Sequence, residues 1–328
     1  MLRVPVKFKR TSFRKNLASR VVEQADRSKA MKLFYTDHFE LPLPPGHRFP
    51  MAKYRRLRDR IVSDSSFDKD ILLVPESVTV EQLYLAHDQS YVDRVIAGEL
   101  SSAEIKRIGF PWSSAMVERS HRSSGATLAA ARHALLDGIA VNMAGGTHHA
   151  MRDAGEGFCV FNDAGVALLT LLSESHIGRA VVIDCDVHQG NGTAQIFSTV
   201  SEVFTFSIHG ERNFPLRKFP SDLDIDLADG TNDMKYLDAL AAGLSRVFIH
   251  GPYDLAIYLA GADPFENDRL GRLKLTKQGL AARDSLVISE LRTRKIPIAI
   301  AMAGGYAHSI DDIVDIHSQT IRIASAAL

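Results

Sequence analysis

The chain has 328 residues, and its 39 lysines and arginines balance 39 aspartates and glutamates, so the formal net charge at pH 7 is zero. A neutral chain has no overall field to attract nucleic acid or an anionic membrane, and no run of about 18 apolar residues predicts a membrane span. The two cysteines, Cys159 and Cys185, are too few for a disulfide scaffold or a cysteine-rich zinc module, and they favour a reducing, cytoplasmic setting.

The first 30 residues differ from the rest of the chain. They carry nine lysines and arginines against only Glu23 and Asp26. They lack the apolar stretch of a secretory signal. We expect a flexible basic tail over residues 1–30, followed by one catalytic domain over residues 31–328. A transit peptide that directs the protein to an organelle, and an arm that binds polyanions, are the alternative interpretations.

Beyond the tail, short β-branched runs alternate with amphipathic segments of helical length. We predict strands over residues 33–35, 139–143, 181–183, 203–208, 255–259 and 298–302. We predict helices over residues 81–97, 113–136, 163–172, 233–248, 276–292 and 311–326. This alternation predicts a single α/β domain of three layers, with helices on both faces of a central, mostly parallel sheet. In such sheets the site lies outside the carboxyl ends of the strands.

Three ligand-type residues follow the apolar strand over residues 181–183. Because side chains alternate along a strand, Asp184, Asp186 and His188 are predicted to point the same way. Carboxylates and imidazoles suit Zn²⁺ or Fe²⁺. Buried carboxylates are costly without a partner, so this strand end requires a metal or salt bridges. We predict a metal centre.

A further carboxylate, Asp263, follows the strand over residues 255–259. Taken alone, it is better explained as a residue that caps a turn before Pro264. Together with Asp186 and His188, it supplies the third ligand of an open catalytic metal site.

Two other strand ends carry groups suited to acid–base work. His148 and His149 follow one strand and two glycines, and imidazoles titrate near neutrality. Tyr306 follows Gly304 and Gly305, and its hydroxyl is suited to donate to a developing oxyanion. A pair of turn histidines and a buried structural tyrosine are the alternatives for each motif taken singly.

Taken together, these motifs resemble the zinc-dependent histone deacetylase family of the arginase/deacetylase fold. The resemblance covers about residues 31–326 and is closest to class IV and its bacterial relatives, on Gln189, Asn191 and the segment around residues 268–276. The segments that carry it appear in the family's order: Gly145–His149, Gly157–Asp163, Asp184–Gly192, Gly261–Asp263, Asn267–Gly271 and Gly304–Tyr306.

The resemblance implies two cations. Zn²⁺, with Fe²⁺ as the alternative, would be held by Asp186, His188 and Asp263. A structural K⁺ would lie at Asp184, Asp186, His188, Ser207 and Ile208, partly through backbone oxygens. Arginase-like relatives bind two metal ions and want further acids where Gly190 and Phe265 stand, so the chain favours one catalytic metal ion.

The resemblance also implies catalytic and substrate-binding roles. His148 would pair with Asp184 and His149 with Asn191, while Tyr306 would polarise the amide carbonyl. The acyl-lysine tunnel would be formed by Gly157, Phe158, Phe214 and Gly304. Many family members have aspartate where Asn191 stands, so this amide would orient His149 while stabilising its imidazolium less strongly. The family often has a third glycine where Ala303 stands.

The implied function is a metal-dependent amidohydrolase that removes acyl groups, most simply acetyl, from lysine side chains of proteins. Long-chain fatty-acyl lysine and small amides such as acetylpolyamines are the alternative substrates. A polyamine would want acids at the tunnel mouth, and Glu156 and Glu211 are candidates by sequence position. A metal-stabilised protein that binds acyl-lysine without hydrolysing it is the non-enzymatic alternative.

Overall fold

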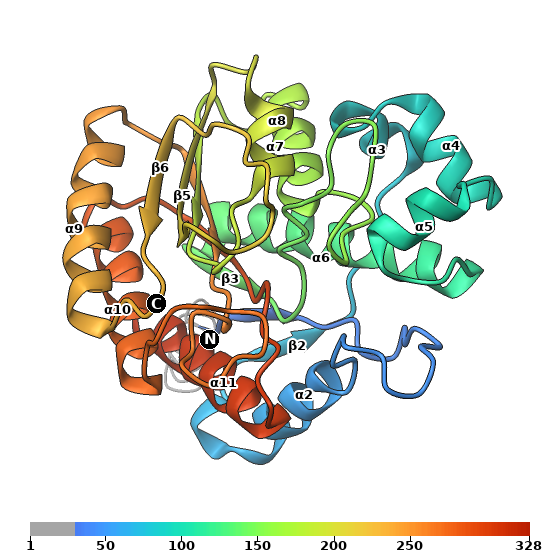
Figure 1. Ribbon diagram of the computed structural model, residues 1–328. Coiled ribbons are helices and arrows are strands. Elements are labelled where there is room, and N and C mark those ends of the chain that lie inside the picture. The colour runs from blue at the N-terminus through green and yellow to red at the C-terminus, as the bar shows by residue number, and fades with distance from the viewer. Residues whose placement is uncertain (1–29) are drawn as a thin grey trace, which may run out of the picture.

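The structure, a computed structural model, describes residues 30–328, so residues 1–29 of the predicted tail lie outside the described part of the chain. The described residues build one sheet of eight parallel strands between two layers of helices (Figure 1). The predicted three-layer α/β fold is therefore confirmed. In chain order the strands are β1 (Lys32–Phe34), β2 (Ile71–Leu73), β3 (Ile139–Asn142), β4 (Ala180–Asp184), β5 (Val203–Gly210), β6 (Leu223–Leu227), β7 (Leu255–Leu259) and β8 (Ile298–Ala301).

The order of strands in the sheet differs from their order in the chain. It runs β2-β1-β3-β8-β7-β4-β5-β6. The last strand in sequence therefore lies in the middle, where Ile300 of β8 is in register with Val141 of β3 and with Tyr258 of β7. The four central strands β3, β8, β7 and β4 are consecutive neighbours, and their carboxyl ends share one edge of the sheet.

Helices cover both faces of the sheet. Helices α6 and α7 pack on one face with α3 and α4 beyond them, and α9, α10, α11 and α2 form the opposite layer (Figure 1). No helix among residues 30–328 is long and apolar enough to cross a membrane. The helices are α2 (Lys53–Ser63), α3 (Val80–Ala86), α4 (Gln89–Ala97), α5 (Ser102–Ile108), α6 (Ser114–Asp137), α7 (Asp163–Ser173), α8 (Asn191–Phe197), α9 (Asp233–Ile249), α10 (Lys277–Thr293) and α11 (Ile310–Ala326).

The central strands are buried on both sides. In β8, Ile298 and Ile300 enter the core under α9–α11, while Ala299 and Ala301 enter the core under α6 and α7. The small alanines allow the long helix α6 to lie close to the sheet. Strands covered on both faces read as continuous apolar runs, which is why the sequence revealed them clearly.

The predicted strands and helices are present, with one correction. The helix predicted over residues 81–97 is two helices, α3 and α4. Thr79 and Gln82 form a capping box that starts α3, and α3 ends at His87, whose backbone is extended. Five elements escaped prediction: β2, β6, α5 and α8, which have at most seven residues each, and α2, whose apolar residues Tyr54, Leu57 and Ile61 lie among charged ones.

The break between α3 and α4 is fixed by the side chain of His87. One ring nitrogen, Nε2, accepts a hydrogen bond from the backbone N–H of Asn162 at 2.9 Å, so Nδ1 carries the proton that is donated to the carbonyl oxygen of Met151 at 2.8 Å. The ring is 2% exposed. Burial, with Arg152 nearby, lowers the pKa of His87 to about 4. The neutral imidazole thus ties the first helices to the loop before α7.

We expect His87 to make the fold acid-sensitive. Its pKa is lower in the folded chain than its ordinary value of 6.5, so the stabilisation is complete above pH 6.5 and declines as the pH falls towards 4. Between pH 7 and pH 5 the free energy of unfolding should drop by about 2 kcal/mol from this group alone. Urea unfolding of the wild type and of His87→Gln at both pH values measures this. An equal pH dependence in the two proteins would contradict the assignment.

Candidate active site

The carboxyl ends of the four central strands converge on one cavity. The loop after β3 carries His148 and His149, and the loop after β8 carries Tyr306. The loop after β4 carries Asp186 and His188. All five side chains line the same cavity, of about 40 Å³. Segments more than 150 residues apart in sequence, from His148 to Tyr306, therefore meet because their strands are neighbours.

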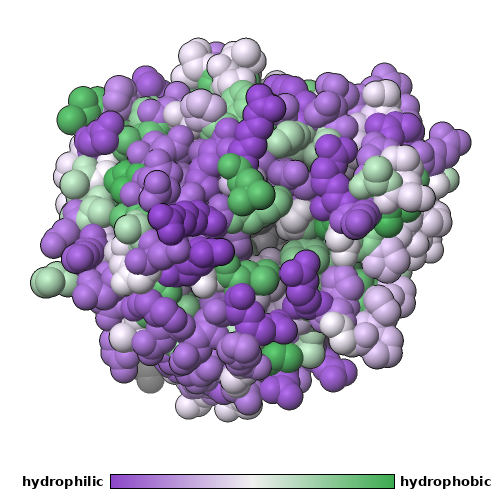
Figure 2. All heavy atoms as spheres, viewed as in Figure 1, coloured by the Kyte–Doolittle hydropathy of each residue, from purple (hydrophilic) through white to green (hydrophobic). Residues whose placement is uncertain are grey.

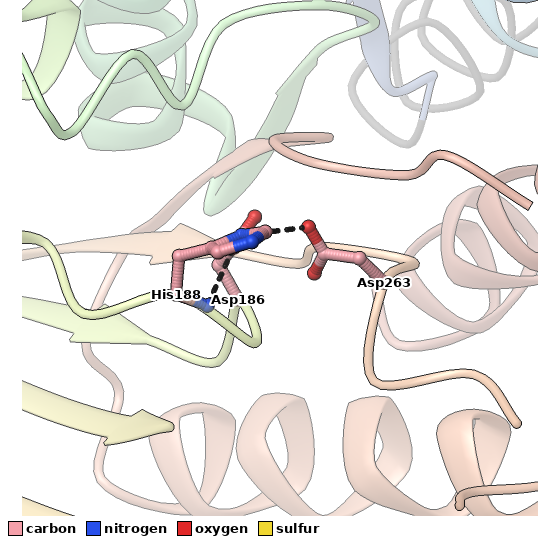
Figure 3. Close-up of side chains that lie close together, drawn as sticks. All are labelled: Asp186, His188 and Asp263. Carbon is pink, nitrogen blue, oxygen red and sulfur yellow. Dashed lines mark hydrogen bonds and ion pairs between the residues drawn. The ribbon is translucent and has the colours of Figure 1, made fainter. Parts of the chain in front are cut away.

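Asp186, His188 and Asp263 form a buried triad at the base of this cavity. Each offers one ligand atom, and the three atoms lie within 4.8 Å of one another. Nδ1 of His188 is 2.9 Å from Oδ1 of Asp186 and 3.3 Å from Oδ2 of Asp263. Figure 3 shows the three side chains pointing towards a common centre from the loops after β4 and β7.

The side-chain alternation predicted from the sequence does not explain this convergence. Strand β4 ends at Asp184, so the alternation of a strand does not extend to Asp186 and His188. The loop brings these two side chains to Asp263 instead. The carboxylate of Asp184 is not part of the triad and contacts Nδ1 of His148.

The triad has the properties of a site for one divalent cation. Oδ1 of Asp263 accepts a hydrogen bond from the backbone of Val187 at 2.9 Å, but Oδ2 receives none from a residue among 30–328. Burial, and then the charge of Asp186, raise the pKa of Asp263 to about 7. Tetrahedral ligands about 2.1 Å from a shared Zn²⁺ are roughly 3.4 Å apart, which is close to the separations found here. The donor set fits Zn²⁺ or Fe²⁺.

Two glycines leave room for the crowded carboxylates. The backbone N–H of Gly304 donates to Oδ2 of Asp186 at 2.7 Å. A Cβ atom at Gly304 would overlap Oδ2 of Asp263, and one at Gly261 would lie 2.6 Å from Oδ2 of Asp186. Gly304 was expected to line the acyl-lysine tunnel, and the structure shows that its lack of a side chain also accommodates the triad.

His148 and His149 lie side by side but have different partners. Nδ1 of His148 is 2.6 Å from Oδ2 of Asp184, a buried carboxylate. Burial alone would lower the pKa of His148, but the charges of Asp184 and Asp186 outweigh it and raise the pKa to about 9. His148 thus shares its proton with a carboxylate.

Nδ1 of His149 instead faces a neutral amide, at 2.7 Å from Oδ1 of Asn191. Burial, followed by the neighbouring His148 and His188, holds the pKa of His149 well below its ordinary value. The two imidazoles, whose ring centres are 4.2 Å apart, are therefore biased towards opposite protonation states, as a general acid and a general base require.

Tyr306 is held from both its backbone and its ring. Its N–H donates to Oδ2 of Asp268 at 2.6 Å. Nζ of Lys53 lies 5.4 Å from the centre of its ring and bonds the carbonyl oxygens of Ala303 at 3.2 Å and Gly305 at 3.4 Å. Burial, together with the nearby carboxylates of the triad, raises the pKa of Tyr306 well above its ordinary value, so the hydroxyl remains a donor.

Sequence reasoning missed Lys53, although it is only 2% exposed. It lies in a segment rich in arginine and lysine, where nothing distinguishes a buried cation from solvated ones. Asp268 was within a quoted motif but was given no role. Both act on the loop that carries Tyr306.

Phe158 and Phe214 form the walls above the cavity. The Phe214 ring packs edge-on against His149 at 4.9 Å, and the Phe158 ring is 5.9 Å from that of Tyr306. Gly157 and Phe158 both have positive φ angles, of 57° and 68°, which is rare for a bulky residue. Their N–H groups donate to the last carbonyls of α5, at Arg107 and Ile108. That contact keeps the aromatic wall in its strained position.

The walls open into a vestibule of about 290 Å³. Three exposed cations, Arg48, Lys106 and Arg107, line it, and no carboxylate of the described residues 30–328 does. None of the three forms an ion pair with another residue in the part of the chain that the structure describes. In Figure 2 this view of the molecule is hollowed near its middle, where hydrophobic side chains border the depression.

The residues expected at a potassium site lie at the end of β4, in the loop that follows it and within the neighbouring strand β5. Asp184 of β4 and Ser207 of β5 are register partners. The hydroxyl of Ser207 is 2.9 Å from Nδ1 of His209. All five expected residues are buried: Asp184, Asp186, His188, Ser207 and Ile208.

Comparison with known proteins gives consistent matches. A family model described as the histone deacetylase domain matches residues 47–321. An uncharacterized protein of Picosynechococcus is 40% identical over 290 residues, covering 88% of this chain and 97% of that protein. Histone deacetylase 2 of Arabidopsis thaliana is 28% identical, covering 80% and 70% of the two chains. The crystal structure of a histone deacetylase homologue from Aquifex aeolicus superposes with a TM-score of 0.76 at 22% identity, covering 90% and 84%.

We expect Gly304→Ala to disrupt the triad. Because the added methyl group would overlap Asp263, zinc affinity should fall roughly 10–100-fold, as for other changes around metal ligands. Gly178→Ala is the control, since its Cβ atom would meet nothing closer than Oδ2 of Asp254 at 3.4 Å. Zinc titration of the two variants, with circular dichroism to verify folding, measures the effect. A folded Gly304→Ala protein with wild-type zinc affinity would refute the packing argument.

Proposed function

Because the chain belongs to the histone deacetylase family and is an amide-bond hydrolase of the lysine deacetylase type, we propose that it removes acetyl groups from lysine side chains of proteins. The observation that carries the proposal is the single cavity in which His148, His149, His188, Asp186 and Tyr306 meet. The reaction is hydrolysis of the amide bond: an acetylated lysine and water give acetate and a free lysine amine.

Asp186, His188 and Asp263 would hold one metal ion, which we propose to be Zn²⁺. When bound, such an ion polarises the amide carbonyl and lowers the pKa of a water molecule. The backbone N–H of Gly304 on Asp186, and that of Val187 on Asp263, keep the two carboxylates in place. This support from the backbone fits a preorganised site.

The remaining residues supply proton transfer and charge stabilisation. His149 accepts the proton of the attacking water at the nitrogen left available by the contact with Asn191. The water oxygen bonds to the carbonyl carbon, and the hydroxyl of Tyr306 donates to the carbonyl oxygen as negative charge develops there. One of the two histidines then returns a proton to the lysine nitrogen as the carbon–nitrogen bond breaks.

The size of the inner cavity favours a short acyl group. Its volume of about 40 Å³ holds roughly three water molecules, at about 10–15 Å³ each. This room suits an acetyl group and the attacking water. A long fatty-acyl chain would exceed this volume and would have to extend past Phe158 or Phe49, whose rings lie 5.3 Å apart beside the cavity.

The charge of the vestibule favours a lysine in a protein over an acetylpolyamine. A polyamine presents ammonium groups, which Arg48, Lys106 and Arg107 would repel. Glu156, a candidate acid from sequence, is engaged by Nδ2 of Asn191 at 2.6 Å. We therefore propose an acetyl-lysine flanked by acidic residues as the preferred substrate.

A structural K⁺ is part of the proposal. The buried carboxylate and hydroxyl of Asp184 and Ser207, on paired strands, supply oxygen donors of the kind that hard cations prefer. Such an ion would bind the strand ends that carry Asp186 and His188. Its role would be structural, because it would lie beside Asp184 rather than in the cavity.

We expect Tyr306→Phe to lose kcat by roughly 10²–10³-fold, the usual effect of removing one oxyanion donor. The ring keeps its packing, so KM, zinc content and thermal stability should remain close to those of the wild type. Amine release from an acetyl-lysine peptide measures this, and a strong chelator should abolish the wild-type rate until Zn²⁺ is restored. Turnover that resists the chelator would contradict the metal's role. A Tyr306→Phe rate near that of the wild type would contradict the role of the tyrosine hydroxyl.

We expect Arg107→Gln to reduce the preference for acidic peptides. Removing one exposed cation should raise KM for an acid-flanked acetyl-lysine peptide by about 2–5-fold, with little effect on a lysine-flanked one. The preference should shrink at high salt. Arg246→Gln is the matched control, because Arg246 is likewise an exposed cation in the last turn of a helix. Equal KM values for the two peptides in the wild type would refute the substrate preference.

A further inference from the structure

Glu156, His149 and Asn191 form a chain of two short hydrogen bonds. Oδ1 of Asn191 is 2.7 Å from Nδ1 of His149, and Nδ2 of Asn191 donates to Oε1 of Glu156 at 2.6 Å. Asn191 is fully buried, whereas Glu156 is partly exposed at the edge of the site. The amide thus joins a histidine in the cavity to a carboxylate outside it.

The carboxylate determines which way the amide faces. An asparagine side chain has two nearly isosteric orientations, with either its oxygen or its NH₂ group towards a given neighbour. An ionised carboxylate only accepts hydrogen bonds, so Glu156 selects the orientation in which NH₂ points outward. The amide oxygen then faces His149, whose Nδ1 must donate. The other nitrogen of His149 is left without a proton.

His148 needs no such device, because its partner is a carboxylate. Asp184 only accepts, so Nδ1 of His148 donates to it directly at 2.6 Å. For His149 the partner is an amide, which would fit an Nδ1 that donates or one that accepts. Glu156, the next residue in this chain of hydrogen bonds, removes the ambiguity that Asn191 introduces.

We propose that Glu156 is a positioning residue, which fixes the orientation of Asn191 and through it the tautomer of His149. The inference rests on the proposed function, since it concerns the base of that reaction. Local structure supports it: the carbonyl of Glu156 accepts from the N–H of Cys159 at 2.9 Å, in the turn that α5 anchors through Gly157 and Phe158. The carboxylate therefore has a fixed location relative to Asn191.

The test exchanges the charges of the pair. Glu156→Ala frees the amide to rotate and should lower kcat about 10–100-fold, while KM and zinc content stay unchanged. Asn191→Asp places two carboxylates in contact and should also lower kcat. In Asn191→Asp/Glu156→Gln, the glutamine NH₂ group can donate to the new aspartate, so activity should recover. Glu156→Gln is thus neutral or harmful alone and beneficial beside Asn191→Asp.

An aspartate at position 191 only accepts hydrogen bonds and fixes the tautomer of His149 directly, so Glu156→Ala should cost far less kcat beside Asn191→Asp than beside Asn191. A purely structural role for Glu156 predicts equal losses in the two backgrounds, and equal losses overturn the proposal. Glu99→Ala is the control, because Glu99 is an exposed acid whose side chain makes no hydrogen bond or ion pair with a residue among 30–328. It should leave kcat unchanged.

A spectroscopic readout separates this inference from the proposed function. Long-range ¹H–¹⁵N correlation spectra of the imidazoles report the tautomer of His149 without any substrate, and a His149→Phe variant assigns its signals. The wild type should show the proton on Nδ1, and Glu156→Ala should show the other tautomer or a mixture. Identical spectra overturn the inference. If the spectra show the expected tautomers but the protein hydrolyses no peptide, the result counts against the proposed function alone.

Discussion

The structure depends on placing three carboxylates in a buried site. Asp184, Asp186 and Asp263 are 2%, 1% and 0% exposed, and charges in such a position are unstable without partners. Each neighbouring feature answers that constraint. His148 neutralises Asp184, His188 lies between the other two, and backbone N–H groups point at them from separate loops. The catalytic groups therefore also offset the free-energy cost of burying the carboxylates.

A buried arginine of the neighbouring helix layer, Arg283, holds two loops of the site together. Arg283 of α10 is fully buried and donates to the carbonyl oxygens of Gly261 at 2.6 Å and Cys185 at 3.2 Å. It thereby joins the loops after β4 and β7, which carry the triad. Its own charge is balanced by Asp284 at 2.8 Å. The helix layer thus contributes polar support to the site as well as apolar packing.

Sequence predicted most of the fold and which polar residues would gather at the strand ends, because both follow from local pattern. Apolar runs revealed the central strands, and polar motifs directly after them revealed Asp186, His188, Asp263 and Tyr306. What escaped prediction depends on contacts between distant segments. His87 interrupts a helical pattern only because Asn162 and Met151 come to meet its ring. The pairing of Glu156 with Asn191 likewise has no sequence signal, since two separate loops create it.

The position of β8 has a consequence for the synthesis of the protein. Strands β1, β2 and β3 lie on one side of it and β7, β4, β5 and β6 on the other, so a nascent chain that ends before residue 298 holds two half-sheets with no strand to join them. These halves expose the apolar edges that β8 later fills, a state open to aggregation and chaperone capture. Catalytic competence therefore cannot arise gradually on the ribosome. It requires that the chain has been synthesised through β8 and Tyr306.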